Sequence, residues 1–288
     1  MSRDPSVARK LWQRLELVHA VTYFAPEAIG ALRDVGYRGF WMGYFAGRAA
    51  PLGAAGPQVV GALFYNFAPS RVSRALPDAW GFAPPEAALE ARLEGSVAAL
   101  RRSFGAAAGG RDVGAAAELA ARAASSAPPD GRALYAANRG LPWPDEPLAV
   151  LWHAATLLRE HRGDGHVATL TAAGLSGREA NVVQAAAGIT PRHVLTTARD
   201  YDDVEWEALV SELARRGVLT VDGKLTPVGQ GLKADIERRT DVIALSAYEV
   251  LDGDEIERLT AALTPLARAV LDSGDVPALT PIGVSLNS

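Results

Sequence analysis

The densest group of side chains that could do chemistry lies within one short stretch of the chain. Three of the five histidines, His153, His161 and His166, occur there together with Glu160 and Asp164. A carboxylate close to an imidazole is the arrangement that general acid–base catalysis requires near neutral pH. The types and spacing of these residues make His153, Glu160 and His166 candidate catalytic residues.

Two other interpretations of this stretch remain open. Two histidines and a carboxylate can bind a transition metal, but their spacing does not match His-Glu-x-x-His or another recognised ligand pattern. In a purely structural interpretation, Asp164 caps a helix and Glu160 pairs with Arg162 at the surface. We expect no metal ion and no cofactor.

A helix must position the first of these side chains. The sequence predicts a helix over about 145–161, in which His153 and Glu160 share one stripe. Gly163-Asp164-Gly165 predicts a turn that brings His166 back toward the same end of that helix. The candidate chemistry is thus expected at a helix end followed by a bend.

Two stretches of the chain resemble each other, which predicts an internal duplication. Arg38-Gly39 aligns with Arg162-Gly163, and Val60 aligns with Val182. Two related units in one chain pack about a pseudo-two-fold axis, as the subunits of an isologous dimer do. We expect the two Arg-Gly bends to face each other across a cleft on that axis.

The expected cleft has aromatic side chains on one side and histidines and acids on the other. Mostly apolar walls with a few convergent polar groups are typical of a small-molecule site, and an arginine can hold a carboxylate there as a bidentate fork. Taken singly, the aromatic residues also fit an ordinary core. The candidate ligand-binding residues are Tyr37, Trp41, Tyr44, Arg48, Tyr65, Asn66, His161, Arg162 and Asp164.

The second stretch has the pattern of a winged helix. Helices are predicted over about 176–187, after Thr190, over 202–216 and over 227–240, and Asp222-Gly223 is a short hairpin signal. The segment ARRGVLTVDGKLTPVGQGL resembles the wing of MarR-like regulators, where a helix ends in Arg-Gly and a hairpin follows.

Most of the chain also resembles a family of bacterial helix-turn-helix proteins. The segments that carry this resemblance are HAVTYFAPEA (19–28), GYFAGRAAPLG (43–53), FYNFAP (64–69), LWHAATLLREHRGDGHVATL (151–170) and TPIG (280–283). The resemblance implies a fold rather than an activity. We therefore predict a mainly α protein made of two pseudo-symmetric winged-helix-like copies, with a short β-hairpin wing in the second.

The expected organisation has four parts. Residues 1–104 form the first winged-helix-like copy with N-terminal helices and end in a helix over about 85–103, and residues 105–144 form a connector rich in Ala, Gly and Pro. Residues 145–240 form the MarR-like copy, and residues 241–288 form a helical extension. The assembled molecule is then either a monomeric pseudo-dimer or a homodimer.

Composition limits the compartment and the partners. With 288 residues, 49% of them hydrophobic and 22% charged, the chain can bury ordinary globular cores. The absence of cysteine excludes disulfides, thiol nucleophiles and Cys-based metal sites. No apolar run reaches the ~18 residues that span a bilayer, and the N-terminus lacks the apolar segment of a signal peptide. We expect a cytoplasmic protein with no membrane partner.

The charge pattern disfavours DNA as a partner. The net charge of −4 gives no general electrostatic attraction for nucleic acid. The helix before the expected wing begins Tyr201-Asp202-Asp203-Val204-Glu205-Trp206-Glu207, which places four acids where a recognition helix meets phosphates. These acids also fit simple stabilisation of a helix N-terminus. The helix after Thr190, with Arg192, His193 and Arg199, is a second candidate for reading DNA.

These observations lead to one main hypothesis and two alternatives. The main hypothesis is a small-molecule-binding winged-helix protein that holds a small organic ligand between its copies. It acts either as a binder or as an enzyme of secondary metabolism that uses His/Glu acid–base chemistry. The first alternative is a MarR-like, ligand-responsive, DNA-binding transcriptional regulator, and the second is a scaffold for protein contacts. The sequence contains no Gly-x-Ser-x-Gly, P-loop or Gly-x-Gly-x-x-Gly motif, which disfavours the enzyme classes that use them.

Overall fold

The chain folds into α-helices, as the computed structural model shows for residues 3–277 and 279–283. Within these ranges it forms fourteen α-helices and no named β-strand, which confirms the predicted mainly α class. In chain order the helices are α1 (Ser6–Phe24), α2 (Pro26–Asp34), α3 (Gly39–Ala49), α4 (Pro57–Phe64), α5 (Pro69–Ser73), α6 (Pro85–Phe104), α7 (Arg111–Ser126), α8 (Ala133–Arg139), α9 (Pro147–Ala172), α10 (Gly177–Ala186), α11 (Arg192–Arg199), α12 (Asp203–Arg215), α13 (Pro227–Leu245) and α14 (Gly253–Asp272).

Local signals in the sequence explain where many of these helices begin. Six of them (α2, α4, α5, α6, α9 and α13) begin on a proline, whose fixed φ suits the first turn and whose missing N–H would be unpaired there anyway. Helix α10 begins with a capping box made by Ser176 and Glu179, and α14 begins with one made by Asp252 and Glu255.

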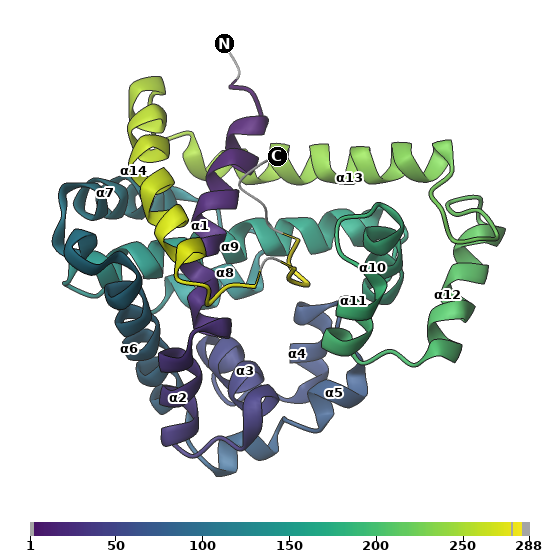
Figure 1. Cartoon of the computed structure of the whole chain (residues 1–288), viewed down its shortest axis with the longest axis horizontal. Coiled ribbons are helices and arrows are strands. Elements are labelled where there is room, and N and C mark those ends of the chain that lie inside the picture. The colour runs from purple at the N-terminus through teal and green to yellow at the C-terminus, as the bar shows by residue number, and fades with distance from the viewer. Residues whose placement is uncertain (1–2, 278, 284–288) are drawn as a thin grey trace.

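The longest helix, α9, lies at the centre of the molecule (Figure 1). It contacts α1, α6, α7, α8, α10 and α13. Its buried Leu151 and Trp152 belong to a core that also draws on α1, α6, α7 and α14. Residues 105–144, expected as a connector, contain α7 and α8. Ala116 and Ala120 of α7 are fully buried, and their small side chains let α7 approach α9 closely.

Two smaller cores complete the fold. One is built from residues of α2 to α6 and includes the buried Phe45, Phe64 and Phe67. The other is built mainly from α10 to α13 and includes the buried Trp206 and Leu213 of α12. Helices α9 and α13 lie side by side, and α10 to α12 lie toward the right-hand side of this pair in Figure 1. Helices α10 to α12 of this third core therefore pack next to the two long helices α9 and α13.

The predicted pair of pseudo-symmetric copies is not found. A bend does precede α3, where Gly39 has a φ of +71°. Arg162 and Gly163, however, lie inside α9, which continues unbroken past the expected turn. Gly165 serves helix packing, because a Cβ on it would lie 3.0 Å from Cγ2 of Ile243 on α13. The two Arg-Gly sites therefore do not form matching bends.

The predicted wing is also reduced. The chain does turn at Asp222-Gly223, but it forms only an isolated antiparallel bridge between Leu219 and Leu225, and no strand appears in the described residues. Backbone hydrogen bonds from Thr220 to Lys224 (2.8 Å) and from Thr226 to Val218 (3.1 Å) close the turn. Its arms are short and pair with no third strand, and a lone short hairpin is only marginally stable.

None of the described helices has the length and apolarity needed to span a membrane.

Candidate functional site

A cavity of about 1100 Å³ lies between the α2–α6 region, the α10–α11 region and the long helices α1, α9 and α13. Its lining is drawn from segments far apart in the sequence, including residues 281–283 near the C-terminus. Eight of the residues predicted for a site line it. They are Trp41, Tyr44, Arg48, Tyr65, Asn66, Arg162, Asp164 and His166.

An aromatic wall forms one side of the cavity. Trp41 and Tyr44, on adjacent turns of α3, pack with their ring centroids 5.6 Å apart, and Tyr44 also packs against Tyr23 of α1 at 5.0 Å. Phe67 lies behind both α3 rings, 5.9 Å from Trp41 and 5.5 Å from Tyr44. Tyr37, also predicted for the site, is buried elsewhere and donates to the carbonyl of Ala83 at 3.1 Å.

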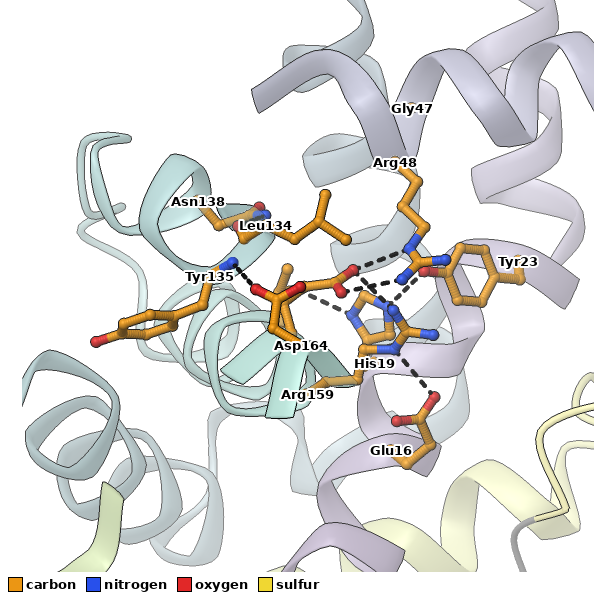
Figure 2. Close-up of polar contacts among 12 residues, drawn as sticks. Glu16, His19, Tyr23, Gly47, Arg48, Leu134, Tyr135, Asn138, Arg159 and Asp164 are labelled. Carbon is orange, nitrogen blue, oxygen red and sulfur yellow. Dashed lines mark hydrogen bonds and ion pairs between the residues drawn. The ribbon is translucent and has the colours of Figure 1, made fainter. Parts of the chain in front are cut away.

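A row of buried ion pairs adjoins the aromatic wall (Figure 2). Arg48 of α3 forms a bidentate pair with Glu160 of α9, at 3.0 and 3.1 Å. Arg159 contacts the same carboxylate at 2.7 Å and also pairs with Glu16 of α1 at 3.4 Å. These contacts join the three helices at the cavity.

Glu160 is a permanent anion in this arrangement. Burial by itself would raise its pKa, but the charges of Arg159 and Arg48 outweigh burial and hold the pKa below its ordinary value. A carboxylate held in this way does not exchange a proton near neutral pH. The geometry supports a structural role for Glu160 instead of the predicted acid–base role.

Two of the three clustered histidines face away from the cavity. His153 packs edge-on against Trp143 at 4.7 Å, and burial lowers its pKa to about 4. His161 packs edge-on against Tyr135 at 5.1 Å, and burial lowers its pKa to about 3. His153 and Glu160 do lie on the same stripe of α9, but α9 extends beyond the cavity. The N-terminal turns of α9, which carry His153, therefore contact other residues.

His166 is the one member of the predicted catalytic group that lines the cavity. Its Nδ1 lies 2.9 Å from Oγ1 of Thr240. That hydroxyl donates to the carbonyl of Ile236, so it accepts from Nδ1–H and leaves Nε2 as the basic nitrogen. Burial lowers the pKa of His166 to about 4. The ring is therefore neutral at physiological pH.

The two remaining polar residues of the predicted group stabilise neighbouring helices. Asp164 accepts a hydrogen bond from the backbone N–H of Tyr135 in the first turn of α8, at 3.0 Å (Figure 2). Burial raises the pKa of Asp164 to about 6. Arg162 pairs with Asp241 of α13 at 2.9 Å and stacks over Trp12 of α1. Both side chains also line the cavity.

The turn after α4 holds α10 against the N-terminal half of the chain. Tyr65 has a φ of +55°, and its hydroxyl donates to the carbonyl of Leu175 at 2.5 Å. The amide of Asn181 on α10 donates to the carbonyl of Asn66 at 3.0 Å. A Cβ on Gly177 would lie only 2.1 Å from the carbonyl oxygen of Tyr65. Glycine is needed there, and the strained turn forms part of the cavity wall.

Arg199 also lines the cavity, although its sequence context suggested only a contact with DNA. It lies at the end of α11 and is 8% exposed. Its guanidinium lies over the ring of Phe67, 4.1 Å from the centroid, and its Nε has no hydrogen-bond partner. No spacing in the sequence marks Arg199, because its isolation depends on which helices surround it.

The N-terminus of α12 presents acidic side chains that are already paired. Asp202 caps the helix by accepting from the backbone N–H of Glu205 at 2.7 Å. Arg192 of α11 pairs with Asp203 at 2.8 Å and with Glu207 at 2.6 Å.

In the described part of the chain, no group of three or more His, Asp or Glu side chains could hold a metal ion.

Comparison with known proteins identifies the family. A model described as a helix-turn-helix family matches residues 8–277. The chain belongs to this helix-turn-helix family. No curated protein and no solved structure matches the chain. The match covers every described cavity-lining residue except Pro281, Ile282 and Gly283.

Proposed function

We propose that this helix-turn-helix protein binds a small organic molecule in the cavity between its aromatic wall and helices α10 and α11. The cavity carries the proposal. Its volume of about 1100 Å³ is slightly larger than the roughly 300–1,000 Å³ typical of small-molecule sites. Trp41 and Tyr44 offer aromatic contacts, and Asn66, His166 and Arg199 add convergent polar groups.

The position of the cavity couples ligand binding to the third core. Asn181 and Gln184 of α10 and Val194 and Arg199 of α11 belong to the wall. A ligand that contacts both these side chains and α3 changes the relative free energies of the positions that α10 and α11 can take with respect to α3. The proposed activity is therefore binding with a conformational consequence for α10 and α11.

A cavity-filling variant tests the proposal. Gly163 lines the cavity from α9, and a Cβ there meets its nearest atom, Oε2 of Glu160, at 3.7 Å. Gly163→Leu should fold, because leucine favours a helix over glycine, and should lose ligand-induced thermal stabilisation. Gly114→Leu is the matched control, since Gly114 lies in α7 and a Cβ added there would meet no atom within 4 Å.

Equal stabilisation of both variants by compounds that stabilise the wild type would contradict the proposed site.

An enzymatic form of the proposal rests on His166, whose Nε2 is basic and which lines the cavity. That form predicts that a bound compound is recovered chemically changed, and that His166→Gln recovers it unchanged with binding retained.

The second candidate function is a MarR-like, ligand-responsive, DNA-binding regulator. Membership of the helix-turn-helix family favours it. The acids of α12 oppose it, because Asp203 and Glu207 remain 92% and 61% exposed despite their pairing with Arg192. Gel shifts with duplexes from the flanking genomic DNA test this function. Binding that weakens steeply with salt supports it, and a lack of binding at every salt concentration dismisses it.

A further inference from the structure

We infer that the cavity takes an aromatic carboxylate and that Arg199 binds the carboxylate group of this ligand. The inference deepens the proposed function and rests on it. The inference follows from the balance of charges around the cavity, from the surroundings of the Arg199 guanidinium, and from the position of this guanidinium beside the aromatic wall.

The balance of charges singles out Arg199. Seven arginine and lysine side chains line the cavity, and six of them have a carboxylate partner within 3.4 Å. These six side chains pair as follows: Arg9 with Asp241, Arg48 with Glu160, Arg71 with Asp200, Arg159 with both Glu16 and Glu160, Arg162 with Asp241, and Lys233 with Glu237. Among the described residues, Arg199 has no ion pair.

The surroundings of Arg199 favour an anion. The guanidinium carbon lies over the ring of Phe67, and this cation–π contact provides no acceptor for the N–H groups, of which Nε has no hydrogen-bond partner. Burial, with a further contribution from the charges of Arg48 and Arg159, lowers the pKa of Arg199. A buried charge without a partner is costly. A carboxylate would accept two parallel hydrogen bonds from the guanidinium and remove that cost.

The aromatic part of the inference follows from Phe67. The ring that supports Arg199 also packs against Trp41 and Tyr44, and both of these line the cavity. A ligand whose acid group meets Arg199 therefore meets aromatic faces next to it. Because Arg199 is 8% exposed, the phosphates of a DNA duplex cannot reach it. A small planar acid fits this geometry.

Matched pairs of compounds test the inference on the wild-type protein. The probes are benzoate with benzamide, 2-naphthoate with 2-naphthamide, and indole-3-acetate with indole-3-acetamide, each followed by thermal shift and by titration calorimetry. We expect the carboxylates to stabilise the protein and the amides to bind at least about tenfold more weakly. Equal binding of both members of each pair would overturn the role of a carboxylate while leaving the proposed function intact. Binding of neither member of any pair would overturn the inference of an aromatic carboxylate, whereas the proposed function is tested separately with Gly163→Leu.

Substitution of Arg199 then tests the residue. Arg199→Met keeps an unbranched side chain against Phe67 and removes the unpaired charge. We expect an unchanged or higher melting temperature without ligand, and loss of the preference for carboxylates over amides. Arg199→Lys, which keeps the charge but not the fork, should keep part of that preference. Arg258→Met, on the exposed face of α14, is the matched control. A preference that survives in Arg199→Met would overturn the assignment.

Discussion

Arg48 and Glu160 form a bidentate ion pair that joins α3 to α9 at the wall of the cavity, with N–O distances of 3.0 and 3.1 Å. Both side chains are largely buried. Arg159 shares the same carboxylate and also pairs with Glu16, so two carboxylates balance the charges of two arginines. A residue whose type suggested proton transfer instead holds the two sides of the cavity together.

Loss of the negative charge at Glu160 should destabilise the fold. Glu160→Gln leaves Arg48 and Arg159 buried without full compensation, so we expect the free energy of unfolding to fall by about 3–5 kcal/mol. Urea denaturation measures this change. Glu212→Gln, which breaks an exposed pair with Arg215, should cost no more than about 1 kcal/mol. Equal effects of the two substitutions would contradict the structural role of Glu160.

A methyl group at Gly177 should separate α10 from the turn after α4. Its Cβ would lie 2.1 Å from the carbonyl oxygen of Tyr65, a backbone atom that cannot rotate away. We expect Gly177→Ala to cost about 1–3 kcal/mol through overpacking, measured by urea denaturation, and to weaken ligand binding. The control Gly114→Ala, in an open part of α7, should be neutral or stabilising by about 0.5–1 kcal/mol. A neutral Gly177→Ala would show that α10 is not held at this turn.

The buried histidines predict a loss of stability as the pH falls. The folded-state pKa values of His153, His161 and His166 are about 4, 3 and 4, all below the ordinary value of 6.5. Their contribution is complete above pH 6.5 and is lost as the pH falls toward those values, because the unfolded chain binds protons first. Asp164, whose pKa is raised to about 6, acts in the opposite direction over part of the range.

Two variants separate these opposing effects. The free energy of unfolding should fall between pH 6.5 and 5, by up to about 1.4 kcal/mol per pH unit for each histidine. His153→Gln should make the fall shallower, and Asp164→Asn should make it steeper. Urea denaturation at several pH values measures the slopes. A wild-type stability that is constant over this window, or a slope that His153→Gln leaves unchanged, would rule out the expected proton uptake.

The segment near the C-terminus should control access to the cavity. Residues 281–283 line the cavity, and the hydroxyl of Thr190 donates to the carbonyl of Thr280 at 3.3 Å. Gly283 has a φ of +71°, and a Cβ there would lie 2.7 Å from Cγ2 of Ile189. Gly283→Val should displace the segment and raise the rate of ligand dissociation, measured by stopped-flow tryptophan fluorescence.

Gly274→Val provides the control for this segment. Gly274 also has a positive φ, of +77°, but no atom lies within 4 Å of the Cβ that a substitution would add. Gly274→Val should therefore lower the stability through backbone strain, but residues 281–283 should stay in contact with Ile189. If both variants change the dissociation rate equally, contact with Ile189 does not hold the segment in place.

The sequence by itself determined most helix positions, because capping and proline signals act within a few residues. The helices predicted over 85–103 and 202–216 occur as α6 and α12, with ends shifted by a residue. The mixture of aromatic and polar residues also indicated a small-molecule site, and eight of the predicted residues line one cavity. Helix positions can be predicted in this way because they depend on local backbone preference, and the small-molecule site stays a prediction from side-chain type.

Only the tertiary structure decided which side chains meet. Gly163-Asp164-Gly165 looks like a turn in isolation, but α13 packs against Gly165 and keeps α9 helical. His153 and Glu160 share a stripe, yet one meets Trp143 and the other meets Arg48. The unpaired state of Arg199 likewise depends on every helix around it. A charge is free or neutralised according to its neighbours in space, and spacing along the chain does not contain that information.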